Sequence, residues 1–100
     1  MPKSVRTRAH NAVMAVLMAA REEAGLTQRE LANLLPAWLE WGHITVAKVE
    51  TGRRNIGYIE VREYARAVGL DVATVERRAT ELAAGRKSGL IKRGKRKSSG

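Results

Sequence analysis

The feature that most constrains the fold is a pair of short helical patterns separated by a proline, in the stretch from Ala24 to Asn55. The first pattern reads LTQRELANLL and the second, after Gly42, reads HITVAKVE. Pro36 interrupts them, because its ring removes a backbone donor and clashes with the preceding helical turn. Gly42 permits a sharp entry into the second helix. We therefore expect two short helices joined by a turn.

The first helix has clear start signals. Thr27 is a good N-cap, because its hydroxyl can accept a hydrogen bond from a free amide of the first turn. Glu30, three residues later, completes a capping box, and Leu26 and Leu31 stand at the positions of a hydrophobic staple. The pattern predicts a helix that begins directly after Thr27, with its N-terminal end free to attract phosphate.

Two motifs in this stretch, LTQRELA and ITVAKVETGRR, resemble the Xre and phage-repressor type of helix-turn-helix domain, which is lambda-repressor-like. In that family the opening is Leu-Thr-Gln-x-x-Leu-Ala and the close is Ile-x-x-(Ile/Val)-Glu-x-Gly-x-(Arg/Lys). A later segment, YARAVGLDVATV, resembles the family's junction between the fourth and fifth helices. The resemblance covers roughly residues 8–80. It implies an all-α fold of five helices, with the second helix of the pair in the DNA major groove.

The resemblance also implies which side chains of that second helix, predicted over 43–52, read base edges. They lie at the start of the helix and one turn later, while Val46 and Val49 point inward. The implied base-reading residues are His43, Ile44, Thr45 and Lys48. Imidazole, hydroxyl and ammonium groups can bond base edges, and Ile44 can contact a thymine methyl group. The alternative for His43 is an ordinary surface histidine.

A second set of residues is expected to contact the phosphate backbone, from the start of the first helix and from the loop after the second. These residues are Thr27, Gln28, Arg29, Thr51, Arg53, Arg54 and Asn55. Glu50 would be repelled by phosphate, so we expect it to be structural and to pair with Arg53 or Arg54. Gly52 is predicted to end the helix in a left-handed conformation. The alternative is a solvated charged loop.

The turn between the two helices is longer than in the resembling family, by about four residues in the segment PAWLEWG. Trp38 and Trp41 would share a face if this segment formed a helical turn. We expect Trp41 to fill the gap between the helices. The alternative is that one tryptophan contacts DNA or a partner protein. The insertion leaves the register of the base-reading helix open.

The remaining domain is predicted to be helical, with no alternating strand pattern. In the first helix Val13, Val16, Leu17 and Ala20 can pack on the helix pair. Met14 and Met18 face elsewhere and need cover from the C-terminal helix or from a second subunit. Two more helices are expected over 59–68 and 72–84. Asp71 caps the last one, and its inward residues are Val72, Val75, Ala79 and Leu82.

Charge divides the chain into a domain over residues 1–84 and a basic tail over 85–100. The net charge is +9, and residues 1–84 hold 12 basic against 10 acidic residues. The cations of the tail are Arg86, Lys87, Lys92, Arg93, Lys95, Arg96 and Lys97. A segment of this composition is expected to be disordered and to bind DNA phosphate without sequence choice. A solubilising tail is the alternative.

Several function classes find no support in the sequence. Cysteine is absent, and neither His10 nor His43 has a companion at metal-ligand spacing, so we expect no metal and no cofactor. No phosphate-binding glycine loop or nucleophile and base pair indicates an enzyme. The apolar run 12–20 is too short to span a bilayer. We expect no membrane association and a cytoplasmic, nucleoid-associated location.

These patterns together indicate a sequence-specific DNA-binding regulator of transcription that binds double-stranded DNA. Repression from a two-fold symmetric operator, by a homodimer, is what the resemblance implies. One alternative is a DNA-binding antitoxin with a protein partner, a toxin or an antirepressor. The other is a protein-interaction module on a helix-turn-helix scaffold.

Overall fold

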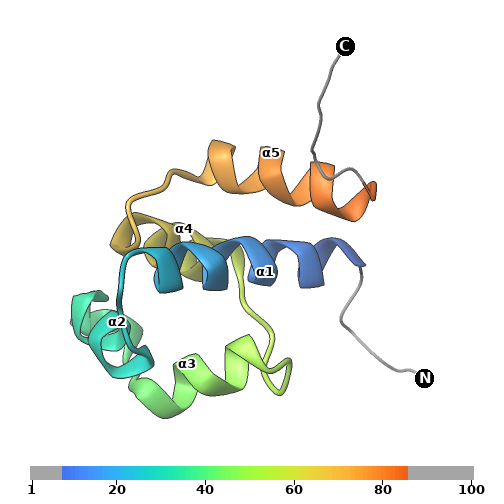
Figure 1. Ribbon diagram of the computed structural model, residues 1–100. Coiled ribbons are helices and arrows are strands. Elements are labelled where there is room, and N and C mark those ends of the chain that lie inside the picture. Colours follow the sequence, from blue (N-terminus) through green and yellow to red (C-terminus); the bar gives the residue numbers. More distant parts are fainter. Residues whose placement is uncertain (1–7, 86–100) are drawn as a thin grey trace.

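The computed structural model describes residues 8–85, which form five α-helices and one short 3-10 helix (Figure 1). The elements in chain order are α1 (Arg8–Glu23), α2 (Gln28–Leu34), η1 (Ala37–Leu39), α3 (His43–Glu50), α4 (Tyr58–Ala67) and α5 (Val72–Ala83). No strand occurs among the described residues, which confirms the predicted all-α class and the number of helices. The predicted tail cations, Arg86 to Lys97, lie outside the described residues.

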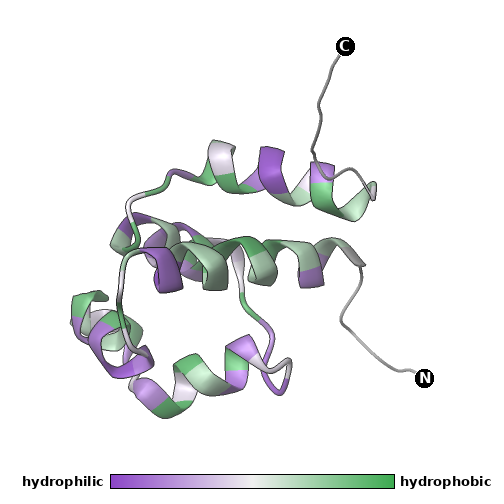
Figure 2. Ribbon diagram, viewed as in Figure 1, coloured by the Kyte–Doolittle hydropathy of each residue, from purple (hydrophilic) through white to green (hydrophobic). Residues whose placement is uncertain are grey.

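The core lies around α1, which runs between α5 on one side and the α2–α3 pair on the other (Figure 1). α1 packs most extensively on α5, and α2 packs mainly on α3. Figure 2 shows apolar residues along most of α1 and polar residues at its ends. The fully buried side chains at the centre include Leu17, Leu31, Val46, Val49 and Tyr64. The inward positions predicted for Val46 and Val49 are confirmed.

The expectations about the apolar residues of α1 and α5 have different outcomes. Met14 is only 2% exposed in a core that includes Val75 of the C-terminal helix α5, and Met18 packs against that core, so the first of the two expected sources of cover is present. The Met14 side chain lies three residues before Leu17, on the same helical face. Leu82, predicted to point inward, is 48% exposed. Val75 and Ala79 already complete the buried face of α5.

The N-terminal ends of α2 and α5 follow the predicted signals, whereas the end of α3 does not. At α2, Thr27 Oγ1 accepts a hydrogen bond from the Glu30 backbone N–H at 3.0 Å, and the Glu30 carboxylate accepts one from the Thr27 backbone N–H at 2.9 Å. At α5, the Asp71 carboxylate caps the helix. α3 ends at Glu50, two residues earlier than predicted, while Gly52 does adopt the expected left-handed conformation with φ of 82°.

The longer turn between α2 and α3 contains η1 and then a residue in the left-handed region, Glu40, with φ of 61°. This change of direction separates the two tryptophans, so the expectation of a shared face is wrong. Trp38 is 62% exposed, whereas Trp41 is buried in the core. The predicted packing role of Trp41 is thus confirmed.

Candidate nucleic-acid interface

The outward face of α3 carries two exposed side chains that form no hydrogen bond or ion pair with other described residues. Ile44 is 60% exposed and Lys48 is exposed one helical turn later. His43, Thr45 and Ala47 are half-buried between them and the body of the protein. Val46 and Val49 point the opposite way, into the core. α3 therefore presents a narrow mixed surface of one apolar and one cationic group.

The structure brings Arg29 of α2 next to the start of α3. Its Nη2 lies 3.5 Å from Nε2 of His43. Two sequence-predicted sets, phosphate contacts and base readers, thus meet at this point. Arg29 and His43 are therefore neighbours at the junction of α2 and α3.

Behind this surface, the carboxylate of Glu50 anchors α3 to three other helices. Arg21 of α1 donates to it twice, from Nε to Oε2 at 2.8 Å and from Nη2 to Oε1 at 3.1 Å. Gln28 of α2 donates Nε2 to Oε1 at 2.9 Å, and Tyr64 of α4 donates its hydroxyl to Oε2 at 2.6 Å. The predicted structural role of Glu50 is right, but its predicted partners, Arg53 and Arg54, are wrong. α3 ends at Glu50, so these arginines do not continue its helical face.

Glu50 and Arg21 form a buried ion pair, and each carboxylate oxygen of Glu50 accepts two hydrogen bonds. The Glu50 side chain is 1% exposed and that of Arg21 is 11% exposed. Burial alone would lower the pKa of Arg21, but the hydrogen bond and charge of Glu50 raise it. Burial and the neighbouring Glu50 carboxylate raise the pKa of the Tyr64 hydroxyl, which keeps it a donor. The Glu50 carboxylate is thus held by four hydrogen bonds from side chains of α1, α2 and α4.

Gln28 has a second consequence for the interface. The side-chain amide of Gln28 donates a hydrogen bond to the Glu50 carboxylate, so the Gln28 side chain points toward the interior rather than toward solvent. Thr27 in turn uses its hydroxyl oxygen as the cap of α2. Arg29 remains the exposed cation at this end of α2. The predicted phosphate contacts of Gln28 and Thr27 remain predictions.

The loop after α3 holds one exposed and one restrained arginine. Arg53 is exposed, and its side chain makes no bond to the described residues. Arg54 donates to the Glu60 carboxylate, with Nη2 3.1 Å from Oε2 and Nη1 3.3 Å from Oε1. Its guanidinium carbon also lies 5.2 Å from the centre of the Trp41 ring, within cation–π range. The loop is thereby tied to the turn insertion.

Glu60 is the anion of this second cluster. Burial alone would raise its pKa, but hydrogen bonds from the Arg54 guanidinium and the Gly57 backbone N–H hold the pKa below its usual range. The Trp41 side chain also lowers the pKa of Glu60. Its buried indole Nε1 has no hydrogen-bond partner among the described residues. Glu60 is therefore ionised and holds Arg54 in place.

Three residues of these clusters were missed by the sequence analysis: Arg21, Glu60 and Tyr64. Only one signal was available for them. Glu50 falls four residues after Val46 on a helix whose inner face is apolar, so a buried carboxylate was implied. Such a group requires donors from elsewhere in the fold. Nothing in the local spacing indicates which donors these are.

Neither a metal-binding cluster nor a membrane-spanning helix occurs within residues 8–85. No group of three or more histidine and acidic side chains is arranged to hold a metal ion there. None of the helices in that range has the length and apolar character needed to cross a bilayer.

Comparison with known proteins gives one finding for this chain. A family model described as a helix-turn-helix domain matches residues 15–78. The matched range begins within α1 and ends within α5, and it includes both anchoring clusters. The searches of curated proteins and of solved structures returned no match.

Proposed function

The chain belongs to the helix-turn-helix domain family, and on that premise we propose that it is a sequence-specific DNA-binding regulator of transcription. In this proposal it acts as a repressor and binds a two-fold symmetric operator as a homodimer. α3 enters the major groove, where His43, Ile44, Thr45 and Lys48 contact base edges.

The observation that carries the proposal is the contrast between the two faces of α3. Its inner face is immobilised by Val46, Val49 and the Glu50 cluster. Its outer face holds Ile44 and Lys48 with no internal partner. A rigid helix with uncommitted side chains is what base reading requires, because the contacts must be presented in a fixed register. Ile44 suits a thymine methyl group, and Lys48 suits the acceptors of guanine.

Phosphate contacts on either side of α3 would fix its position in the groove. Arg29 and Arg53 are exposed cations at the two ends of this surface, with Thr51 and Asn55 beside Arg53. Gln28 and Arg54 are less available, because each must give up a hydrogen bond to a carboxylate before it can reach DNA. We therefore assign most of the positioning to the exposed pair.

The homodimer is proposed because one domain of this size contacts too few base pairs for specificity among genomic sites. Two copies related by a two-fold axis would bind half-sites about 34 Å apart, or a multiple of that distance. Enrichment from a pool of random duplexes tests this directly. We expect a selected sequence with inverted half-sites at such a spacing. Selection of no sequence would refute the regulator, and selection of single asymmetric sites would refute the symmetric dimer.

Substitutions of base-reading residues and of phosphate-contacting residues should change DNA affinity in different ways. We expect Lys48→Ala to weaken the selected site by roughly 1–3 kcal/mol while random DNA is affected less. Arg53→Ala, the matched control, should weaken the selected site and random DNA about equally. The measurement is equilibrium binding to both duplexes at one salt concentration. An equal loss on both duplexes for Lys48→Ala would make Lys48 a phosphate contact and would place the register of α3 in error.

A further inference from the structure

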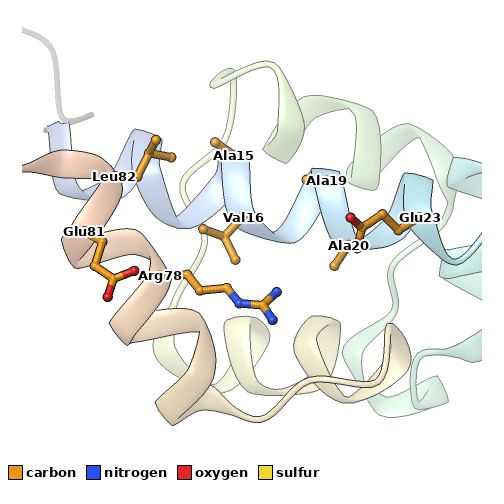
Figure 3. A pocket seen from close by; sticks show the side chains of 8 residues that line it. All are labelled: Ala15, Val16, Ala19, Ala20, Glu23, Arg78, Glu81 and Leu82. Atoms are coloured by element: carbon orange, nitrogen blue, oxygen red, sulfur yellow. The ribbon is translucent and has the colours of Figure 1, made fainter. Parts of the chain in front are cut away.

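A shallow groove of about 270 Å³ runs between α1 and α5 (Figure 3). Apolar side chains of α1 line it together with Arg78, Glu81 and Leu82 of α5, and Glu23 lies at its far end. We propose that this groove is the surface on which a second copy of the chain binds. This inference rests on the proposed function, which requires a homodimer. It identifies the groove as the surface where the two copies meet.

The apolar part of the surface combines small side chains on α1 with one projecting leucine on α5. Ala15 and Ala19 are exposed one helical turn apart, and with the half-buried Val16 they form a shallow apolar floor. Leu82, from the neighbouring helix, is 48% exposed beside this floor. A projecting leucine and an alanine floor on the same patch suit an isologous interface, where each copy inserts its leucine over the floor of the other.

The charged part of the surface is complementary in the same way. In Figure 3 Arg78 extends over the groove between Glu81 on one side and Glu23 on the other. None of the three forms an ion pair with another residue in the range 8–85. In a two-fold arrangement the arginine of one copy meets the carboxylates of its partner, and the contact is made twice.

The charge balance of the described body also permits self-association. Of the 19 basic residues, two lie in residues 1–7 and seven in residues 86–100, which leaves ten in residues 8–85 against all ten acidic residues. Two such bodies carry no net charge to repel each other. The groove uses only residues of α1 and α5, so a partner bound there leaves the outer face of α3 open to DNA.

Sedimentation of the full chain without DNA tests the proposal. We expect the unmodified chain to dimerise and Leu82→Asp to weaken dimerisation by about tenfold or more, because it buries an unpaired charge. Leu34→Asp is the matched control: Leu34 is a similarly exposed leucine on α2, outside the groove, and its change should leave dimerisation unaltered. Circular dichroism of each variant establishes that it remains helical.

A mixing experiment tests the charge pairing itself. Arg78→Glu alone and the double variant Glu23→Arg with Glu81→Arg should each be monomeric, because like charges then meet across the interface. Mixed together, they should restore a dimer, because every contact again joins opposite charges. Failure to restore it would overturn the proposed pairing.

Three results would overturn the interface as a whole: a monomeric unmodified chain, a dimer that survives Leu82→Asp, or a dimer that Leu34→Asp abolishes. The outcome for the regulator is separate. A dimer that behaves as expected but selects no DNA sequence would contradict the proposed function and leave this surface assigned.

Discussion

The Glu50 carboxylate accepts hydrogen bonds from side chains of α1, α2 and α4, and it is the point where α3 is held in place. A buried ion pair adds little stability compared with a well-packed apolar pair, but removing one partner leaves an uncompensated charge. The cluster therefore contributes mainly to the position of α3. Each of its donors should be costly to remove.

Tyr64→Phe isolates one of these bonds without changing the ring that packs in the core. We expect the free energy of unfolding to fall by about 1.5–3 kcal/mol, because a hydrogen bond to a charged group is removed. Tyr58→Phe is the matched control, since Tyr58 is exposed and should change stability by no more than about 0.5 kcal/mol. Chemical denaturation followed by circular dichroism measures both. Equal effects would mean that the hydroxyl of Tyr64 contributes nothing through Glu50.

Glu60 should make the free energy of unfolding depend on pH in the acid range. Its pKa is lower in the folded chain than the ordinary value, so its contribution is present above the ordinary glutamate pKa and is lost as the pH falls through the folded value. The Arg54 side chain is 40% exposed, and solvent screening limits the contribution to about 1 kcal/mol or less. We expect Glu60→Gln to flatten the decline of unfolding free energy in acid. Glu22→Gln, at an exposed residue without an ion pair in the described range and outside the proposed interface, should leave that decline unchanged.

At the scale of elements, the turn insertion is a packed part of the domain. Trp41 fills the core at the junction of α2 and α3, and the Arg54 guanidinium covers its ring. The left-handed Glu40 turns the chain so that Trp38 remains outside. The insertion thus connects the start of α3 with the loop that follows it.

The two tryptophans should respond oppositely to truncation. Trp41→Ala is expected to destabilise the fold by about 3–5 kcal/mol, because a large core side chain is removed. Trp41→Phe should have a smaller effect of the same sign, which keeps the comparison possible if the alanine variant does not fold. Trp38→Ala should change stability by no more than about 0.5 kcal/mol. A large loss for Trp38→Ala in thermal unfolding would contradict its position outside the core.

The sequence was sufficient to predict the five α-helices, but not η1 and not all of the buried faces. The capping box at Thr27 and the cap at Asp71 are local, and both helices begin where these signals placed them. Leu82 was misplaced, and the source of cover for Met14 was left open, because their burial depends on how α5 lies against α1, which local spacing does not specify. The partners of Glu50 were missed for the same reason: Arg21 is 29 residues away in sequence.

At the scale of the whole molecule, the excess positive charge lies outside the described body. Residues 8–85 hold as many acidic as basic residues, so the net charge of +9 comes from the two terminal segments. If the chain binds DNA as proposed, the terminal cations supply affinity that does not depend on sequence, while α3 supplies the choice of sequence. The two properties should then be separable.

Deletion of residues 86–100 tests that separation. We expect the truncated chain to keep its helical content and its preferred site, but to bind more weakly. The log–log slope of affinity against salt should become shallower by about 0.9 for each phosphate that the truncated chain no longer neutralises. A salt titration of both chains on one duplex gives the two slopes. Identical slopes would mean that these residues do not bind DNA, and failure to fold would place the domain boundary at residue 85 in error.

The two faces of α3 also determine how the protein can change over generations. The packing and hydrogen bonds that hold the helix in place come from Val46, Val49 and Glu50, whereas Ile44 and Lys48 are exposed and outside the core. Substitutions on the outer face therefore cost the fold almost nothing. Those two side chains can therefore be exchanged one at a time by evolution or by design, and every intermediate is expected to fold; if α3 reads DNA as proposed, each exchange changes the sequence that is read.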